Sequence, residues 1–211
     1  MDRILKMSYR EKFHKAFQAA CSYHDRIPDF IAQRLDGGAV AELASVWQAG
    51  IMPIPEHVPD EEKYAAAHNN WQWMARCNLE FIEEQLGRQG IDDYVRGEVQ
   101  HMRRTLSELD LAGARFLDVI APRLGFRAKA EQLLYEMQWM TPLALTVVSG
   151  QGLQARTSPC KMLETPGMQH QGCELNCRRI LSGVAAGEFH IKLDFQCQGD
   201  GCRISLTPLS S

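Results

Sequence analysis

Apolar positions recur at helical spacing through the first 140 residues and alternate with polar positions near the end of the chain. Spacings of three and four residues are typical of amphipathic helices, whereas alternation is typical of half-buried strands. Prolines and glycines separate the helical stretches, and Pro28 interrupts the first of them. Helices are therefore predicted over five ranges, residues 2–35, 39–48, 61–86, 92–120 and 127–138.

The pattern changes after Pro142, where residues 143–148 and 152–157 predict two short strands. A helix predicted over Cys173–Leu181 and a second pair of strands follow. Residues 198–201, Gln-Gly-Asp-Gly, predict the turn between these strands, with glycines that permit positive φ. The expected fold class is α+β, with a helical N-terminal two-thirds followed by a small antiparallel sheet region and a Cys-rich hairpin. The alternating apolar positions of the last two strands are Phe189, Ile191, Leu193 and Phe195, then Ile204 and Leu206.

The segment Met52–Pro59 holds three prolines in eight residues and is the clearest predicted linker. We expect residues 1–58 to form a helical N-terminal arm, which is a candidate element for homodimerisation. Residues 59–211 are expected to form an α+β ligand-binding domain, with a metal-binding C-terminal region at about 142–207.

Four of the seven cysteines lie near the C-terminus, at positions 173, 177, 197 and 202. Cys173 and Cys177 are four residues apart, which places both sulfurs on one side of the predicted helix. Cys197 and Cys202 flank the predicted turn as a candidate opposed pair, whose Cβ atoms would lie about 4.5–5.5 Å apart. Two thiols on a helix and two at a hairpin can close one site.

Three interpretations of these thiols compete. Sulfur-rich tetrahedral sites are typical of structural zinc, and iron–sulfur clusters also take four thiolates. Disulfides would need an oxidising compartment. Free cysteines, finally, are often simply buried as small apolar side chains. The spacings C-x3-C and C-x4-C leave metal binding and plain burial open, with disulfides the third choice.

The run Asp194-x2-Cys197-x-Gly199-Asp200-x-Cys202-Arg203, with a cysteine about twenty residues upstream, resembles the end of 4-vinyl-reductase-like domains. The related L-2-amino-thiazoline-4-carboxylic acid hydrolase-like proteins end in a similar way. The resemblance implies an α+β ligand-binding fold in residues 142–207, found in small-molecule sensors, tetrapyrrole-pathway accessory proteins and hydrolases. It also implies a zinc ion held by Cys173, Asp194, Cys197 and Cys202.

Asp194 and Cys197 are an odd number of residues apart, so a regular strand would place them on opposite faces. Binding of one ion by both would need a bulge or a local twist. Cys177 is the alternative fourth ligand, and with it the site would be all-thiolate.

Composition excludes several function classes. The chain has 211 residues, a net charge of −3, 45% hydrophobic residues and 23% charged residues. This balance gives no reason to expect a nucleic-acid partner or an anionic membrane surface. No apolar run is long enough to span a bilayer, and the first residues do not resemble a secretory signal. An odd number of cysteines without an export signal favours free thiols and a cytoplasmic location.

Other residues have weaker functional interpretations. His68, Trp71, Trp73 and Cys77 lie on the long predicted helix, and an aromatic core stripe is the preferred interpretation. His190 is a candidate partner of Asp194, although a solvent-facing strand residue is preferred. Cys160 and His170 lie in the predicted loop before Cys173, where they could join the metal ligands or line a pocket. His170 is also a candidate base for a nucleophilic Cys160 or Cys177.

The leading functional hypothesis is a small-molecule-binding protein, sensory or accessory, with a structural zinc site formed by the C-terminal cysteines. Its ligand would be apolar or aromatic and would contact Trp71, Met74 and Trp139. The alternatives are a metal-dependent hydrolase of a small heterocycle or amide, with an open coordination position for water, and an iron–sulfur or tetrapyrrole-pathway accessory protein.

Overall fold

A computed structural model describes residues 6–107, 116, 119–141, 143–146, 152–160 and 172–209. The chain divides into two compact units, one formed by Met7–Tyr94 and one that begins at Val95. Residues 7–58 therefore belong to the same compact unit as the segment that follows the proline-rich linker. The separability of residues 1–58 as an arm stays a prediction.

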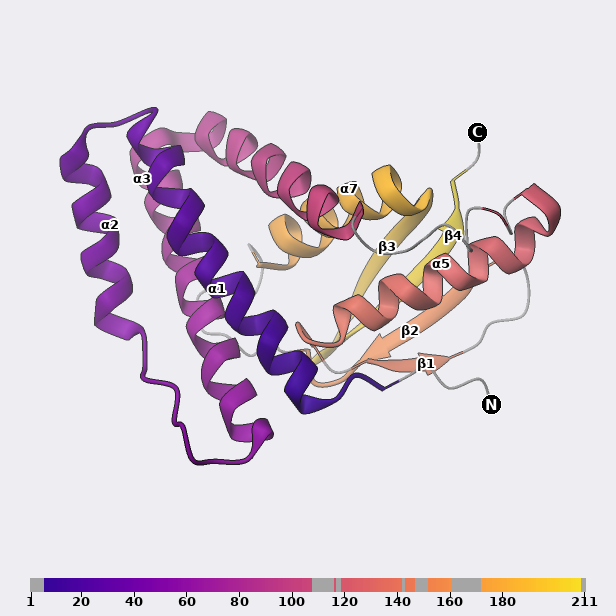
Figure 1. Cartoon of the computed structure of the whole chain (residues 1–211). Coiled ribbons are helices and arrows are strands. Elements are labelled where there is room, and N and C mark those ends of the chain that lie inside the picture. Colours follow the sequence, from indigo (N-terminus) through magenta and orange to yellow (C-terminus); the bar gives the residue numbers. More distant parts are fainter. Residues whose placement is uncertain are drawn as a thin grey trace. The chain divides into compact units, whose positions relative to one another are not determined.

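The first unit contains α1 (Tyr9–Ala32), α2 (Gly37–Gly50) and the first part of α3 (Asp60–Ser107) (Figure 1). Ser8 begins α1 with a capping box, in which its hydroxyl accepts from the Glu11 backbone and the Glu11 carboxylate accepts from the Ser8 backbone. The predicted interruption at Pro28 is wrong, because α1 continues through this proline. The buried side chains of Ile27 and Ile31 on either side hold the helix against its neighbours despite the lost backbone hydrogen bond.

Helix α3 is kinked at Gly87, which has φ 61° and ψ −160°. Glycine reaches this positive φ without steric cost, so the predicted helix end at Gly87 is confirmed as a break between two helical segments. The segment after the break runs to Ser107, and most of the remainder of the helix predicted over residues 92–120 lies outside the described residues.

The second unit contains α5 (Pro122–Met137), a four-stranded antiparallel sheet in the order β1-β2-β4-β3, and a helix between β2 and β3. The strands are β1 (Ala144–Thr146), β2 (Leu153–Thr157), β3 (Ile191–Gln198) and β4 (Gly201–Pro208). Together the two units confirm the predicted α+β class, with helices first and a small antiparallel sheet at the end.

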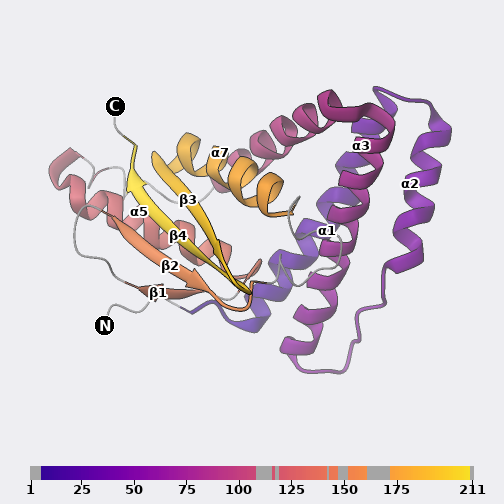
Figure 2. The same cartoon turned by 180° about the vertical axis from the view of Figure 1, so that it is seen from behind.

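One face of this sheet is buried. Along β3, Ile191, Leu193 and Phe195 are buried and the residues between them are exposed. The register places Phe195 opposite Ile204, and Ile204 opposite Ala155 of β2, so one apolar row crosses three strands. Helix α5 contacts β2, and Figure 2 shows it behind the sheet. The sheet therefore has one covered face and one polar face, as an amphipathic antiparallel sheet requires.

The helix before β3 winds partly as a π-helix, in three consecutive pieces: η1 (Cys173–Leu181), α7 (Ser182–Val184) and η2 (Ala185–Phe189). Phe189 was predicted to start a strand, and this is wrong because the helix continues through it. His190, with φ 53°, turns the chain from the helix into β3. Every fourth residue of this helix is buried: Cys173, Cys177, Leu181, Ala185 and Phe189.

Within the part of the chain that the structure describes, no helix is both long enough and apolar enough to cross a membrane.

Candidate functional site

The C-terminal hairpin positions two of the cysteines. Cys197 of β3 pairs directly with Cys202 of β4, which confirms the predicted opposed pair. Gly199 has φ 62° and is the first residue of the two-residue turn, a position that favours glycine in hairpins. Gly201 does not have the predicted positive φ. A side chain at Gly201 would instead collide with the backbone carbonyl of Thr157, so glycine is needed there for the close approach of β2.

Cys160 is brought to the same hairpin by the segment after β2. Its backbone nitrogen donates to the Asp200 carbonyl at 2.8 Å, and the Ser158 hydroxyl donates to the Asp200 carboxylate at 3.2 Å. The side chain of Cys160 is 5% exposed. These contacts fix Cys160 beside the turn that joins Cys197 to Cys202.

Helix η1 supplies Cys173 and Cys177, and both are buried on its inner side. Because π-type winding is wider than α-helical winding, residues four apart stay on one face. The outer side of η1 carries Arg178, whose guanidinium lies 3.2 Å from the Glu174 carboxylate. A second nitrogen of Arg178 lies 3.5 Å from the Phe195 carbonyl, which is a weak contact from the helix to β3.

Four sulfurs from the helix and the hairpin form a continuous chain. The Sγ atoms of Cys173 and Cys197 lie 3.3 Å apart, in a contact between residues 24 positions apart in the sequence. The Cys177 thiol donates to Cys173, and the Cys202 thiol donates to Cys197. The arrangement therefore joins Cys177, Cys173, Cys197 and Cys202 through three S–H···S contacts. We refer to these four residues and Cys160 as the thiol cluster.

The thiol cluster concentrates negative charge on one sulfur. The hydrogen bond from Cys177 lowers the pKa of Cys173 to about 6, and the hydrogen bond from Cys197 and the positive charge of Arg178 act in the same direction. Hydrogen bonds donated to a thiolate favour the charged form, in the same way as a neighbouring cation does. At neutral pH, Cys173 is therefore the thiolate of the cluster.

The other cluster thiols keep their protons. Donation to Cys173, followed by burial, raises the pKa of Cys177 well above its usual range. Burial is the main cause that raises the pKa of Cys202 to about 12, and the negative charge of Cys197 and Cys173 adds to it. The pKa of Cys197 is also raised, by burial and then by its hydrogen bond to Cys173. An electrostatic interaction with Cys160 also raises the pKa of both Cys177 and Cys202, so this fifth sulfur lies near them.

A tetrahedral metal site with metal–sulfur bonds of about 2.3 Å has sulfurs about 3.8 Å apart. The 3.3 Å separation of the Cys173 and Cys197 sulfurs is about 0.5 Å shorter than that edge length. Among the described residues, no group of three or more His, Cys, Asp or Glu side chains has a geometry that could hold a metal ion. Coordination by the cluster would therefore require its sulfurs to turn from one another toward a common centre.

Asp194 does not share this centre. The register of β3 and β4 is regular from Ile191 to Gln198, without the bulge that ligation by Asp194 would need. The Asp194 carboxylate lies on the exposed face of the sheet and accepts from the Gln196 amide at 3.1 Å. The four residues of the ligand set implied by the resemblance are thus not brought together, and Cys177, not Asp194, contacts Cys173.

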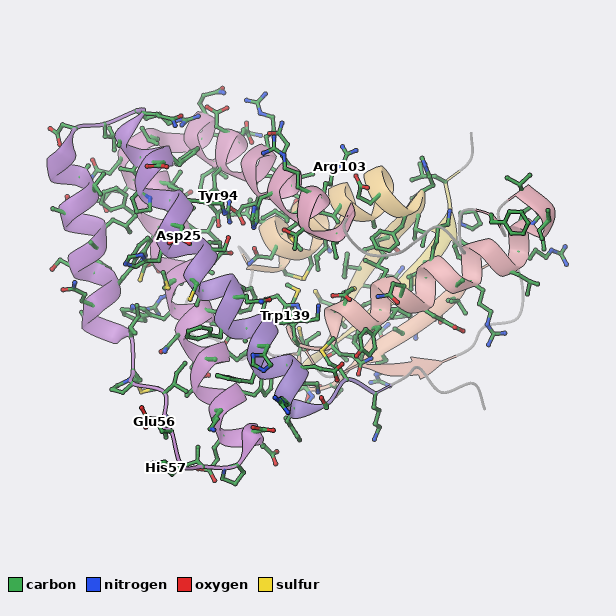
Figure 3. The ribbon with its side chains drawn as sticks, viewed as in Figure 1. Asp25, Glu56, His57, Tyr94, Arg103 and Trp139 are labelled. Atoms are coloured by element: carbon green, nitrogen blue, oxygen red, sulfur yellow. The ribbon has the colours of Figure 1, made fainter. Side chains whose placement is uncertain are left out.

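The three residues expected to contact a ligand are divided between the two units. Trp71 and Met74 are 4% and 2% exposed in the core of the first unit, where the Trp71 ring lies 5.5 Å from the His68 ring. Trp139 follows α5 in the second unit and is partly exposed (Figure 3). The structure does not bring these three side chains together within either unit, so the ligand site stays a prediction.

The long-helix cluster is part of a core, as expected. His68, Trp71 and Cys77 are buried, and the Trp73 indole donates to the Trp47 carbonyl at 3.2 Å. His190 is exposed, with a structural role at the helix-to-strand junction, and His170 lies outside the described residues.

The sequence predicts a loop position for Cys160 and leaves its role open, because its place in the cluster depends on a backbone contact with the hairpin turn. The sequence pattern gives no signal for Asn176. It shares the buried side of η1 with Cys173 and Cys177, and its amide nitrogen has no hydrogen-bond partner among the described residues. A buried donor of this kind fits a thiolate or carbonyl acceptor.

Comparison with models of protein families gives no match to this chain, and comparison with curated proteins gives none either. The resemblance to 4-vinyl-reductase-like domains therefore depends on the C-terminal motif alone.

Proposed function

We propose that the second unit binds one metal ion, zinc, through Cys173, Cys177, Cys197 and Cys202, with Cys160 adjacent. The ion would be the structural centre of a small-molecule-binding protein with a sensory or accessory role. The observation that carries the proposal is the contact between a helix thiol and a hairpin thiol, with 3.3 Å between the Cys173 and Cys197 sulfurs. It lies within a chain of thiol contacts that also includes Cys177 and Cys202.

The protonation pattern of the thiol cluster supports a cation as the missing partner. In the metal-free cluster one thiolate is stabilised by thiol donors, while the pKa values of its neighbours are raised. A divalent ion replaces the thiol protons and converts all four sulfurs to ligands. Simple burial of a cysteine needs no such contact with other cysteines, because a single thiol packs well among apolar side chains.

A metal ion here would join two elements that are distant in the sequence. Cys173 and Cys177 belong to η1, and Cys197 and Cys202 belong to β3 and β4. Binding energy at such a site adds directly to the stability of the folded unit. The small-molecule part of the proposal is supported by the resemblance of residues 142–207 alone.

An iron–sulfur cluster is the second candidate, and the exclusion of Asp194 from the thiol cluster favours it. Four thiolates without a carboxylate are the common ligand set of both structural zinc and iron–sulfur clusters. A hydrolytic metal site is less well supported, because it needs three protein ligands and an open position for water.

Metal analysis of the full chain, together with its visible absorption spectrum, tests the proposal. We expect about one zinc per chain and no visible band. The variants Cys177→Ser and Cys202→Ser should each lose the ion, and Cys21→Ser should keep it, because Cys21 is exposed on α1 in the first unit. A broad visible absorption band together with bound iron would show that the site holds an iron–sulfur cluster and not zinc. Protein that contains no metal and takes up none after reduction would contradict both.

A further inference from the structure

We propose that Cys173 and Cys197 form an oxidisable pair, which a hydroperoxide converts to a disulfide with release of the bound ion. This inference rests on the proposed metal site for the release step, whereas disulfide formation itself depends only on the two thiols. The thiol cluster is thus a site of oxidative modification, and the reagent that modifies it is a hydroperoxide.

The geometry selects this pair. The Cys173 and Cys197 sulfurs are 3.3 Å apart, and they must approach to about 2.05 Å to form a bond. They come from η1 and β3, so the new bond would link the helix covalently to the sheet.

Solvent access distinguishes this pair from the other cysteine pairs of the thiol cluster. Cys197 is the exposed member of the thiol cluster, because it lies at the end of β3 where the strand leaves the covered part of the sheet. Cys160, Cys177 and Cys202 are buried. A hydroperoxide therefore meets the cluster at Cys197, and the sulfur in contact with Cys197 is that of Cys173.

The reaction proceeds in two balanced steps. Cys197, the accessible sulfur of the pair, first gives up its proton and attacks a peroxide oxygen as a thiolate; the O–O bond breaks, hydroxide or alkoxide leaves, and a sulfenic acid forms on Cys197. The second sulfur then attacks the sulfenic sulfur, forming the S–S bond and releasing the hydroxyl as water. The two sulfurs together lose two electrons and two protons, and the hydroperoxide is reduced to water and an alcohol or to two waters.

Disulfide formation removes two thiolates from the proposed ligand set. Cys177 and Cys202 would remain, and two thiolates do not provide the four ligands of a structural zinc site. Oxidation would therefore detach the ion and replace a reversible metal cross-link between η1 and the hairpin by a covalent one. Reduction by a dithiol would restore both thiols and the metal site.

The test uses the full-length Cys21→Ser protein, loaded with zinc and treated with hydrogen peroxide. Zinc release is followed with a chromogenic chelator, and the disulfide is identified by mass spectrometry. Cleavage after Glu174 separates Cys173 from Cys177, and cleavage before Asp200 separates Cys197 from Cys202, so each pairing gives a distinct cross-linked peptide. We expect release of the bound zinc in step with the Cys173–Cys197 peptide, and recovery of both free thiols with dithiothreitol.

Two variants serve as controls. Cys197→Ser should give no Cys173 cross-link, and Cys77→Ala should behave as the parent protein because Cys77 lies in the first unit. Zinc-loaded protein that retains its ion in peroxide, or that forms another pairing, would overturn the inference and leave the proposed metal site intact. A Cys173–Cys197 disulfide in protein that never binds metal would overturn the metal site and the release step while supporting the thiol pair.

Discussion

Cys77 and Cys173 are both buried cysteines on helices, and their surroundings give them opposite chemistry. Burial is the main cause that raises the pKa of Cys77, which is 3% exposed in the first unit. Cys173 is 7% exposed in the second unit, but thiol donors lower its pKa to about 6. Burial alone raises the pKa of a thiol, whereas hydrogen bonds donated by neighbouring thiols lower the pKa of the one sulfur that accepts them.

The two units also differ in how they satisfy buried polar groups. In the first unit the Trp47 indole donates to the Asn78 amide oxygen at 2.9 Å. Asn70 exchanges two hydrogen bonds with the backbone of Met52, at 2.9 and 2.8 Å. In the second unit the thiols have mainly one another, and a sulfur is a weak donor and acceptor. Trp47 and Asn70 thus bond to groups of their own unit, whereas the sulfurs of the thiol cluster bond mainly to one another.

The largest expected effect is that of metal removal on the second unit. Cys177→Ala should abolish zinc binding and lower the melting temperature by about 10 °C or more, because the cross-link between η1 and the hairpin is lost. Cys77→Ala should leave both zinc content and the response to chelator unchanged. Calorimetry with and without a chelator measures these melting temperatures. An equal shift with chelator in the two variants would show that the two units do not differ in metal dependence.

The pH dependence of the metal-free protein sharpens the same contrast. The pKa of Cys173 is lower in the folded state than in the unfolded chain, so its contribution to stability is complete above the unfolded value and is lost as the pH falls through about 6. The stability difference between the parent and Cys173→Ser should therefore be large at about pH 8 and mostly gone at about pH 5.5.

Denaturant unfolding at the two pH values measures this difference, with Cys77→Ser as the matched control. Burial raises the pKa of Cys77, so its difference from the parent should not change over the same interval. A difference for Cys173→Ser that is independent of pH would mean that the thiolate is absent.

A smaller effect is expected in the first unit. Trp47→Phe removes the donor to Asn78, whose side chain is 0% exposed, so the amide oxygen would be left unpaired. The expected cost is about 1–3 kcal/mol of unfolding free energy. Trp73→Phe should cost less, because that indole is partly exposed and water can replace it. Both values should be unaffected by zinc or chelator, and a chelator-dependent loss for Trp47→Phe would show that the units are not energetically separate.

The smallest effect concerns an ion pair within the second unit. Arg103 of α3 lies 2.7 Å from Glu188 of η2, with its side chain 46% exposed (Figure 3). Pairs at this exposure contribute about 0–1 kcal/mol, and salt weakens them. Arg103→Gln should therefore reduce stability slightly at low ionic strength and not at high ionic strength. A loss that persists in high salt would indicate that Arg103 acts through packing over Gly187 and not through its charge.

Several features of the fold follow from local sequence. The alternation of apolar residues fixes β3 and β4, and the Gly199-Asp200 turn fixes their register, so the opposition of Cys197 and Cys202 could be predicted. The four-residue spacing of Cys173 and Cys177 fixes their common helix face. Gly87 breaks α3 because its conformation has positive φ.

Local pattern could not predict contacts between segments distant in sequence. Pro28 is tolerated because Ile27 and Ile31 are buried on either side, and Phe189, a buried residue, ends the helix and does not start the strand. The meeting of the Cys173 and Cys197 sulfurs and the approach of Cys160 to the hairpin turn depend on how η1 and the end of β2 pack against the sheet. The sequence by itself determined which cysteines share a face, since that depends on helix and strand periodicity. Only the tertiary structure decided which faces meet, and with them the lowered pKa of Cys173, because charge and hydrogen bonding act through space.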